Sequence, residues 1–182
     1  GLVWYGGVIG GTLAVVAWAW WRQMLNLALL DVSAIALALG YAIGRIGCQV
    51  SGDGDYGIRS DLPWAMGYPH GTVRTLPGVT VQPTPIYETL AMGLVAWALW
   101  RWRDSVRPGA LFAVYLVLSG VERLLVEFIR RNHVVAAGLT APQLESIGLA
   151  LVGVAALFFF ARRGGVRAAG GAGAAAGGVQ LA

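Results

Sequence analysis

The sequence predicts an all-α integral membrane protein, in which five transmembrane helices form a bundle and carry a polar head between the second and the third. Composition is the first observation behind this fold class, because 57% of the 182 residues are hydrophobic and only 12% are charged. A soluble domain carries about twice that charged fraction, roughly 25%. The second observation is that apolar residues gather in long runs, and the third is that most arginines stand at the ends of these runs.

Five apolar segments approach or reach the ~20 residues that a helix needs to cross a bilayer. They cover residues 3–21, 27–46, 86–102, 109–129 and 143–161. Residues 47–85 are polar and rich in glycine and proline, which predicts an extramembrane head or a loop along the membrane surface. Residues 1–163 are therefore expected to form a single transmembrane domain. The Gly/Ala-rich residues 164–182 have few large side chains to bury, so they predict a disordered tail.

The arginines predict how the bundle is oriented. With five spans, the C-terminus lies on the side of the first and third connections, and the positive-inside rule places this arginine-rich side in the cytoplasm and the head outside. The chain enters an apolar run directly from Gly1, so this run is not expected to be a signal peptide, and the natural N-terminus is expected further upstream. The arginines on the cytoplasmic side are Arg22, Arg101, Arg103, Arg107, Arg162, Arg163 and Arg167.

One function class, nucleic-acid binding, and one structural class, a disulfide-bonded fold, are excluded at this stage. Binding of nucleic acid requires clustered basic residues on a solvated face, whereas these arginines end apolar segments. The single cysteine, Cys48, excludes an internal disulfide framework.

Charged residues close the fourth apolar segment. Arg123, Glu127 and Arg130 are spaced at i, i+4 and i+7, so they are expected on one face of a helix. A charge at the centre of a span costs about 3 kcal/mol or more, so Arg123 needs a partner, and Glu127 lies one turn away. One interpretation is a structural ion pair near the interface. The favoured one is an anion site facing a cavity, because a guanidinium binds two phosphate oxygens at once.

Two further stretches carry candidate polar residues. Arg45 lies three residues before Cys48 among several glycines, and either its side chain extends to the lipid headgroups or nearby backbone N–H groups join it around an anion. The third apolar segment is expected to open with Thr84 as N-cap and a proline in the first turn, followed by Tyr87 and Glu88. Glu88 either stabilises the positive end of that helix or contributes to a site.

At these residues the chain resembles the prolipoprotein diacylglyceryl transferase family. The family's Gly-Arg-x-Gly-Asn signature, with an acidic residue after a following Asn-Gly, is similar to residues 44–53, and its His-Pro-x-Gln-x-Tyr-Glu element is similar to residues 82–88. Its Arg-x-x-x-Glu-Phe-x-Arg element is similar to residues 123–130, its His-Gly-Gly element to residues 5–7, and its Gln-x-x-Ser to Gln143 and Ser146. These elements occur in the family's order along nearly the whole chain.

The resemblance implies a fold and an activity. The family has seven transmembrane helices, of which the five segments here match the last five. It transfers the diacylglyceryl group of phosphatidylglycerol, a membrane lipid, to the lipobox cysteine thiol of prolipoproteins in the bacterial plasma membrane, which forms a thioether and releases glycerol phosphate. No cofactor or metal is implied. The implied catalytic residues are Arg45, Arg123, Tyr5 and Glu127, and the implied substrate-binding residues are Gly44, Gly47, Cys48, Ser51, Asp53, Tyr87, Glu88 and Arg130.

Several positions depart from the family pattern. Tyr5 and Gln82 replace histidines, Cys48 and Ser51 replace asparagines, and Asp53 replaces a glutamate. Phosphate binding by the arginines is therefore the better supported half of the mechanism. The proton acceptor stays open, because a phenol titrates at about pH 10 and is a weak base, and the candidate carboxylates cannot be ranked. These carboxylates are Asp53, Glu88 and Glu127.

Rival functions remain at this stage. Cys48 is expected to have a polar or packing role, because alkylation of its thiol would leave a stable thioether and trap the enzyme. Ser51 has a faint resemblance to a serine protease nucleophile, but no apolar segment offers a histidine to activate it. A stronger rival is a catalytically inactive relative that binds lipid or a partner membrane protein.

Overall fold

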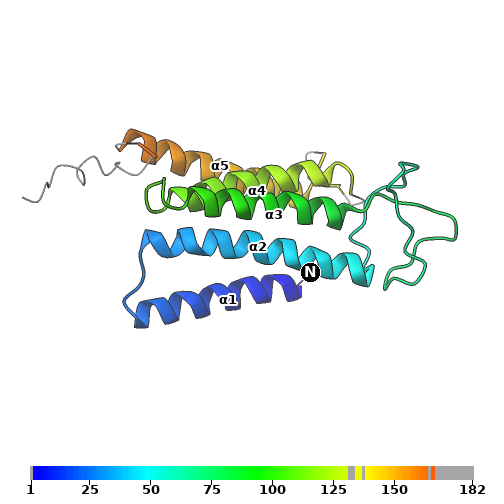
Figure 1. Cartoon of the computed structure of the whole chain (residues 1–182), viewed down its shortest axis with the longest axis horizontal. Coiled ribbons are helices and arrows are strands. Elements are labelled where there is room, and N and C mark those ends of the chain that lie inside the picture. Colours follow the sequence, from blue (N-terminus) through cyan, green and yellow to red (C-terminus); the bar gives the residue numbers. More distant parts are fainter. Residues whose placement is uncertain (1, 131–133, 137, 164, 167–182) are drawn as a thin grey trace, which may run out of the picture.

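The structure is a computed structural model that describes residues 2–130, 134–136, 138–163 and 165–166. The tail expected at 164–182 therefore lies almost entirely outside the described residues. Within them the chain forms five helices and one short antiparallel hairpin (Figure 1). The elements are α1 (Leu2–Trp21), α2 (Leu27–Ser51), α3 (Thr84–Trp102), α4 (Ala110–Glu127), β1 (Val134–Ala136), β2 (Leu139–Thr140) and α5 (Ala141–Arg162).

Each helix coincides with one of the five apolar segments, so the predicted helical class is confirmed. Two of them, α2 and α5, are long and apolar enough to cross a membrane by length and composition. Large apolar side chains point outward, with Leu94 64% and Trp97 63% exposed, while the interior contact of α2 is made of alanines. Water would oppose this arrangement and lipid would not, because helices in a bilayer associate through small residues.

The helices pack in pairs at short separation. α2 lies against α3, and Ala34, Ala38 and Ala42, spaced by four residues, form a fully buried stripe against Met92 and Ala96 of α3. α4 lies against α5, where a Cβ at Gly120 would stand 2.7 Å from the Ser146 carbonyl oxygen, so only glycine fits this approach. α4 also contacts α2 and α3, which closes the bundle.

Helix α1 is different from the rest. It lies alongside α2 in Figure 1, but at a wider separation than the packed helix pairs. A turn at residues 22–26 leads from it to α2, whose N-cap Asn26 accepts a hydrogen bond from the Leu29 N–H at 3.0 Å. α1 is therefore held to the bundle through this turn.

The head differs from its predicted limits of 47–85, because α2 continues to Ser51 and α3 already begins at Thr84. Gly44 and Gly47 remain helical, since a helix satisfies the backbone N–H and C=O groups that lipid cannot. The sequence suggested that backbone N–H groups near Arg45 bind an anion. In the structure the N–H groups of these two glycines lie within the helix and are not free to do so. The first break comes at Gly52, whose φ of 57° is the left-handed conformation that ends helices.

The structure also corrects two predictions, the N-cap of α3 and the position of Arg130 on α4. Thr84 is the first residue of α3 and not its N-cap, and its hydroxyl donates a hydrogen bond to the Asp55 carbonyl instead. α4 ends at Glu127, so Arg130 lies in the turn after the helix and not on it.

The head, residues 52–83, folds back onto the ends of the helices. Tyr56 and Tyr68 stack with ring centroids 4.9 Å apart and form a small core with Val81. The Ile58 N–H donates to the Ile129 carbonyl at 2.8 Å, and the Tyr68 hydroxyl donates to Gln49 at 2.9 Å. The head is thus attached both to α2 and to the turn that follows α4.

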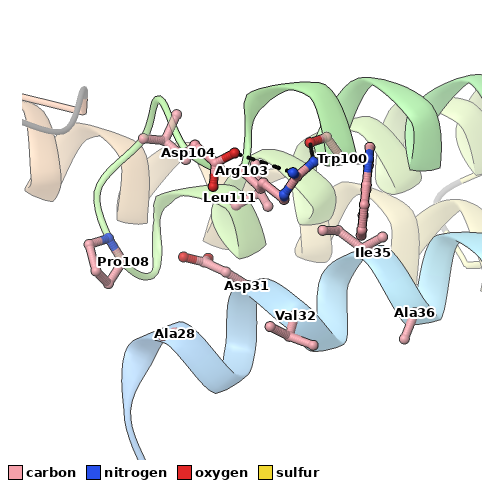
Figure 2. A pocket seen from close by; sticks show the side chains of 11 residues that line it. Ala28, Asp31, Val32, Ile35, Ala36, Trp100, Arg103, Asp104, Pro108 and Leu111 are labelled. Atoms are coloured by element: carbon pink, nitrogen blue, oxygen red, sulfur yellow. Dashed lines mark hydrogen bonds and ion pairs between the residues drawn. The ribbon is translucent and has the colours of Figure 1, made fainter.

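At the opposite end of the bundle, Asp31 of α2 caps α4. Its carboxylate accepts hydrogen bonds from the Gly109 N–H at 2.8 Å and the Phe112 N–H at 2.9 Å. Figure 2 shows Asp31 on one side of a mainly apolar cavity of about 430 Å³, with Arg103 and Asp104 opposite. The first N–H groups of a helix have no partner within the helix, so a carboxylate from a neighbouring helix both satisfies them and fixes the two helices together.

We expect Asp31→Ala to lower the free energy of unfolding by about 1–2 kcal/mol, as loss of a helix cap does. Denaturant titration of the protein in detergent measures this difference. Asp104→Ala is the matched control, because Asp104 is exposed and its ion pair with Arg103, at 3.4 Å, contributes about 0–1 kcal/mol. Equal stability of Asp31→Ala and wild type would contradict the capping role.

Candidate active site

Three arginines converge on one buried carboxylate, that of Glu88. Its side chain is 0% exposed and lies in the second turn of α3, at the head end of the bundle. Arg45 forms an ion pair with Oε2 through its Nε, although this contact lacks regular hydrogen-bond geometry. Arg123 and Arg130 approach Oε1 at 3.3 and 3.2 Å. α2, α3, α4 and the turn after α4 therefore meet at a single charge.

Two further carboxylates complete this arginine cluster, which we define as Arg45, Arg123 and Arg130. Asp55, from the head, forms ion pairs with both Arg45 and Arg130. Glu127 pairs with Arg123 at 3.2 Å, and accepts a hydrogen bond from the Thr140 hydroxyl at 2.6 Å. A buried charge persists only when it is paired and hydrogen-bonded, and here each guanidinium has at least two anionic partners.

Tyr41 stands one helical turn before Arg45. The Arg45 Nη2 donates to the Tyr41 hydroxyl at 3.0 Å, and its guanidinium carbon lies 4.9 Å from the centre of the ring. Tyr41 thereby fixes the direction of the Arg45 side chain, so this guanidinium is already placed before any ligand arrives.

A cavity of about 480 Å³ opens beside the cluster. All three arginines line it, together with Tyr41, Asp55 and Glu122, and its other walls come from α5, from Met92 of α3 and from Tyr115 and Ser119 of α4. Guanidinium groups held in place around a partly apolar cavity form a site for an anionic group that carries hydrocarbon, since planar forks bind phosphate oxygens in pairs.

Asp55 remains ionised in this setting. Its partial burial raises its pKa, but the neighbouring Arg130 and Arg45 lower it more strongly, so the net shift is downward. The head therefore contributes a fixed negative charge to the cluster.

The structure brings together five of the residues predicted for the site: Arg45, Arg123, Arg130, Glu88 and Glu127. Arg45 and Arg123 share Glu88, which confirms that they converge. Cys48 is close, with its sulfur 3.9 Å from Arg45 Nη1, but it does not line the cavity. The Tyr5 side chain lies outside the part of the chain that the structure describes.

Other predicted site residues lie elsewhere. Gly44 and Gly47 are exposed helical positions with open space where a Cβ would be. Ser51 donates its hydroxyl to the Cys48 carbonyl at 3.2 Å, and the exposed Asp53 accepts the Asp55 N–H at 3.2 Å. Tyr87 joins α3 to the head, because it donates to Gln82 at 2.8 Å and accepts from Trp64 at 2.6 Å.

Gln143 and Ser146, the two polar residues of the predicted Gln-x-x-Ser element, stabilise the start of α5. Gln143 and Thr140 form a capping box, in which the Thr140 N–H donates to Gln143 Oε1 at 2.9 Å. Ser146 is 1% exposed and donates to the Pro142 carbonyl at 2.6 Å. They hold the start of α5 against the cluster, since Thr140 also contacts Glu127.

Sequence reasoning missed Asp55, Tyr41 and Glu122. The spacing of Tyr41 and Arg45, one turn apart on the same helix, was a usable signal. Asp55 was harder to predict from the sequence, because the head carries several acidic residues and only its folded conformation shows which one contacts the arginines. Asp55 also lies within 4.8 Å of Cys48 and Asp53, a grouping of metal-ligand types. Its oxygens are already paired with guanidinium groups, so this trio does not fit a cation.

Comparison with known proteins gives consistent matches. The profile of the family described as prolipoprotein diacylglyceryl transferase matches residues 1–159. A phosphatidylglycerol–prolipoprotein diacylglyceryl transferase of Leptospira interrogans is 36% identical over 151 residues, which are 81% of this chain and 47% of that protein. Enzymes of the same name from Finegoldia magna and Bordetella parapertussis are each 32% identical, over 85% and 89% of this chain and 59% and 62% of theirs. The chain thus spans about half to three fifths of these relatives.

The lowered pKa of Asp55 predicts a pH dependence of stability. A carboxylate with a lowered pKa stabilises the folded state above its unfolded pKa of about 3.9, and this contribution is lost as the pH falls through the folded value. The difference in unfolding free energy between wild type and Asp55→Asn should be constant above about pH 5 and shrink below about pH 4. Denaturant titrations between pH 3 and 7 measure it.

Asp61→Asn is the matched control, because Asp61 is an exposed carboxylate of the same head. It should differ little from wild type at every pH. A difference for Asp55→Asn that stays unchanged down to pH 3 would contradict the ionised role of Asp55.

Proposed function

Because the chain belongs to the prolipoprotein diacylglyceryl transferase family, we propose that it transfers the diacylglyceryl group of phosphatidylglycerol to the lipobox cysteine of prolipoproteins. The arginine cluster beside the cavity is the observation that carries this proposal. The relatives are named for these two substrates, and the cluster supplies what the lipid substrate requires, namely cationic donors for its phosphate.

In the proposed reaction the thiolate sulfur of the peptide attacks the terminal glyceryl carbon that carries the phosphate. The bond from this carbon to the phosphate oxygen breaks, its electron pair stays on that oxygen, and glycerol phosphate leaves as a thioether forms. Negative charge grows on the leaving phosphate, and Arg45 and Arg123 stabilise it because they already point into the cavity. Glu88 holds both of them in place, together with Asp55 at Arg45 and Glu127 at Arg123.

The arrangement of the chain in the membrane is part of the same proposal. We propose five membrane spans within a single domain of residues 1–163, in the bacterial inner membrane, with the C-terminus and the tail of residues 164–182 in the cytoplasm. The cluster lies at the head end of the bundle (Figure 1), so it would face the outer side. There it meets the lipobox peptides of exported prolipoproteins as well as the membrane lipid.

The direct test supplies phosphatidylglycerol vesicles and a lipobox peptide to the full-length protein in detergent or nanodiscs. We expect the peptide cysteine to gain the mass of one diacylglyceryl group, with release of an equal amount of glycerol phosphate, both measured by mass spectrometry. A lipobox peptide with serine in place of cysteine is the control. Folded protein that binds the lipid but transfers nothing would instead identify an inactive, lipid-binding relative.

A second test addresses the phosphate anchor. Arg123→Ala should lower kcat by about 10²- to 10³-fold, because it removes one donor to the developing charge. Arg123→Lys should recover only part of this loss, since an ammonium lacks the planar fork. Arg101→Ala, an exposed arginine in the last turn of α3, is the control and should transfer like wild type. Unchanged kcat in Arg123→Ala would remove Arg123 from the mechanism.

A further inference from the structure

Glu122 is a buried carboxylate that forms no ion pair or hydrogen bond with the residues that the structure describes. It lies on α4 directly before Arg123, it is 9% exposed, and its Oε1 makes no hydrogen bond within the described part of the chain. The other carboxylates of the site, Asp55, Glu88 and Glu127, are each paired with at least one arginine. Of these four carboxylates, Glu122 alone forms no ion pair with an arginine of the described residues.

An unsatisfied buried carboxylate is destabilising, and such groups call for a functional explanation. Glu122 lines the same 480 Å³ cavity as Arg45, Arg123 and Arg130. Because Glu122 contributes to the wall of this cavity, a group that enters it meets the Glu122 side chain next to the guanidiniums assigned to the phosphate. A lone pair that no protein donor occupies is what a proton acceptor needs.

We propose that Glu122 accepts the proton of the substrate thiol. This inference rests on the proposed function. The thiol S–H bond breaks, its proton moves to Glu122, and its electron pair stays on sulfur, which then attacks the glyceryl carbon. The departing phosphate takes up the proton from Glu122, so the carboxylate is regenerated and no other reactant is consumed.

The neighbouring carboxylates are less suited to this step. Glu88 and Asp55 are each contacted by two or more guanidiniums, and Glu127 by Arg123 and Thr140, so accepting a proton would disrupt the cluster. Protonation of Glu122 breaks no hydrogen bond or ion pair of the described structure. The titratable and charged groups that face it are Tyr41 and Arg45 of α2, Asp55 of the head, Glu88 of α3, Tyr115 and Arg123 of α4, Arg130, and Glu145 of α5.

The test compares the pH profile of transfer for wild type and Glu122→Gln, which has nearly the same shape but cannot accept the proton. We expect kcat at neutral pH to fall by about 10²- to 10⁴-fold, as loss of a general base does, with KM for phosphatidylglycerol nearly unchanged. The rising limb of the profile should move toward about pH 8.5, where a free thiol ionises by itself. Glu122→Asp, which keeps a carboxylate, should retain the original limb at a lower rate.

A second peptide separates proton transfer from a structural role. Selenocysteine in place of the lipobox cysteine is already ionised at neutral pH, so Glu122→Gln should transfer to it nearly as fast as wild type. Asp61→Asn is the control, because it changes an exposed carboxylate of the head that does not line the cavity and should leave the pH profile unchanged.

The outcomes distinguish this inference from the proposed function. A wild-type protein that transfers to neither peptide contradicts the proposed function. A wild-type protein that transfers, together with a Glu122→Gln variant that keeps the wild-type kcat, overturns the inference alone. A loss of rate in Glu122→Gln that is equal at every pH and for both peptides also overturns it.

Discussion

The pairing of Glu88 with three arginines is the interaction on which the rest of the structure depends. It joins α2, α3 and the end of α4 at one point in the interior, where an unpaired charge would be strongly destabilising. The alanine stripe of α2 and the close approach at Gly120 bring the helices near enough for these contacts. The head is drawn in through Asp55, so its path is set by the same charges.

Much of the fold could be predicted from the sequence, because lipid imposes simple rules on it. Apolar runs of sufficient length must become helices, and all five were found in this way. The head begins later than its predicted limit, because α2 continues as a helix to Ser51 and Gly47 is part of it, as a helix is the favoured backbone in lipid. Glycine is a weaker guide to turns in this environment than in water.

The candidate site was only partly predictable. Charges inside apolar segments need partners, and this rule indicated that Arg123 pairs with a carboxylate. For Arg45 and Glu88 the sequence left two roles open, and the structure shows both in the same cluster. The choice of Asp55 over Asp53 could not be made, because it depends on how the chain turns after Gly52. Glu122 was not predicted, because only the residues spaced at i, i+4 and i+7 on that helix were selected, and Glu122 lies outside this spacing.

Glu88 and the three arginines that pair with it are far apart along the chain, and this affects the order in which the cluster forms during synthesis. Arg45 emerges from the ribosome well before Glu88, and the other arginines follow later still. α2 must therefore enter the membrane while its guanidinium is unpaired, which is tolerable because Arg45 lies about two turns from the end of the helix and can stay among the headgroups. The cluster closes only after α4 has been translated, so a nascent chain that stops earlier has no assembled pocket.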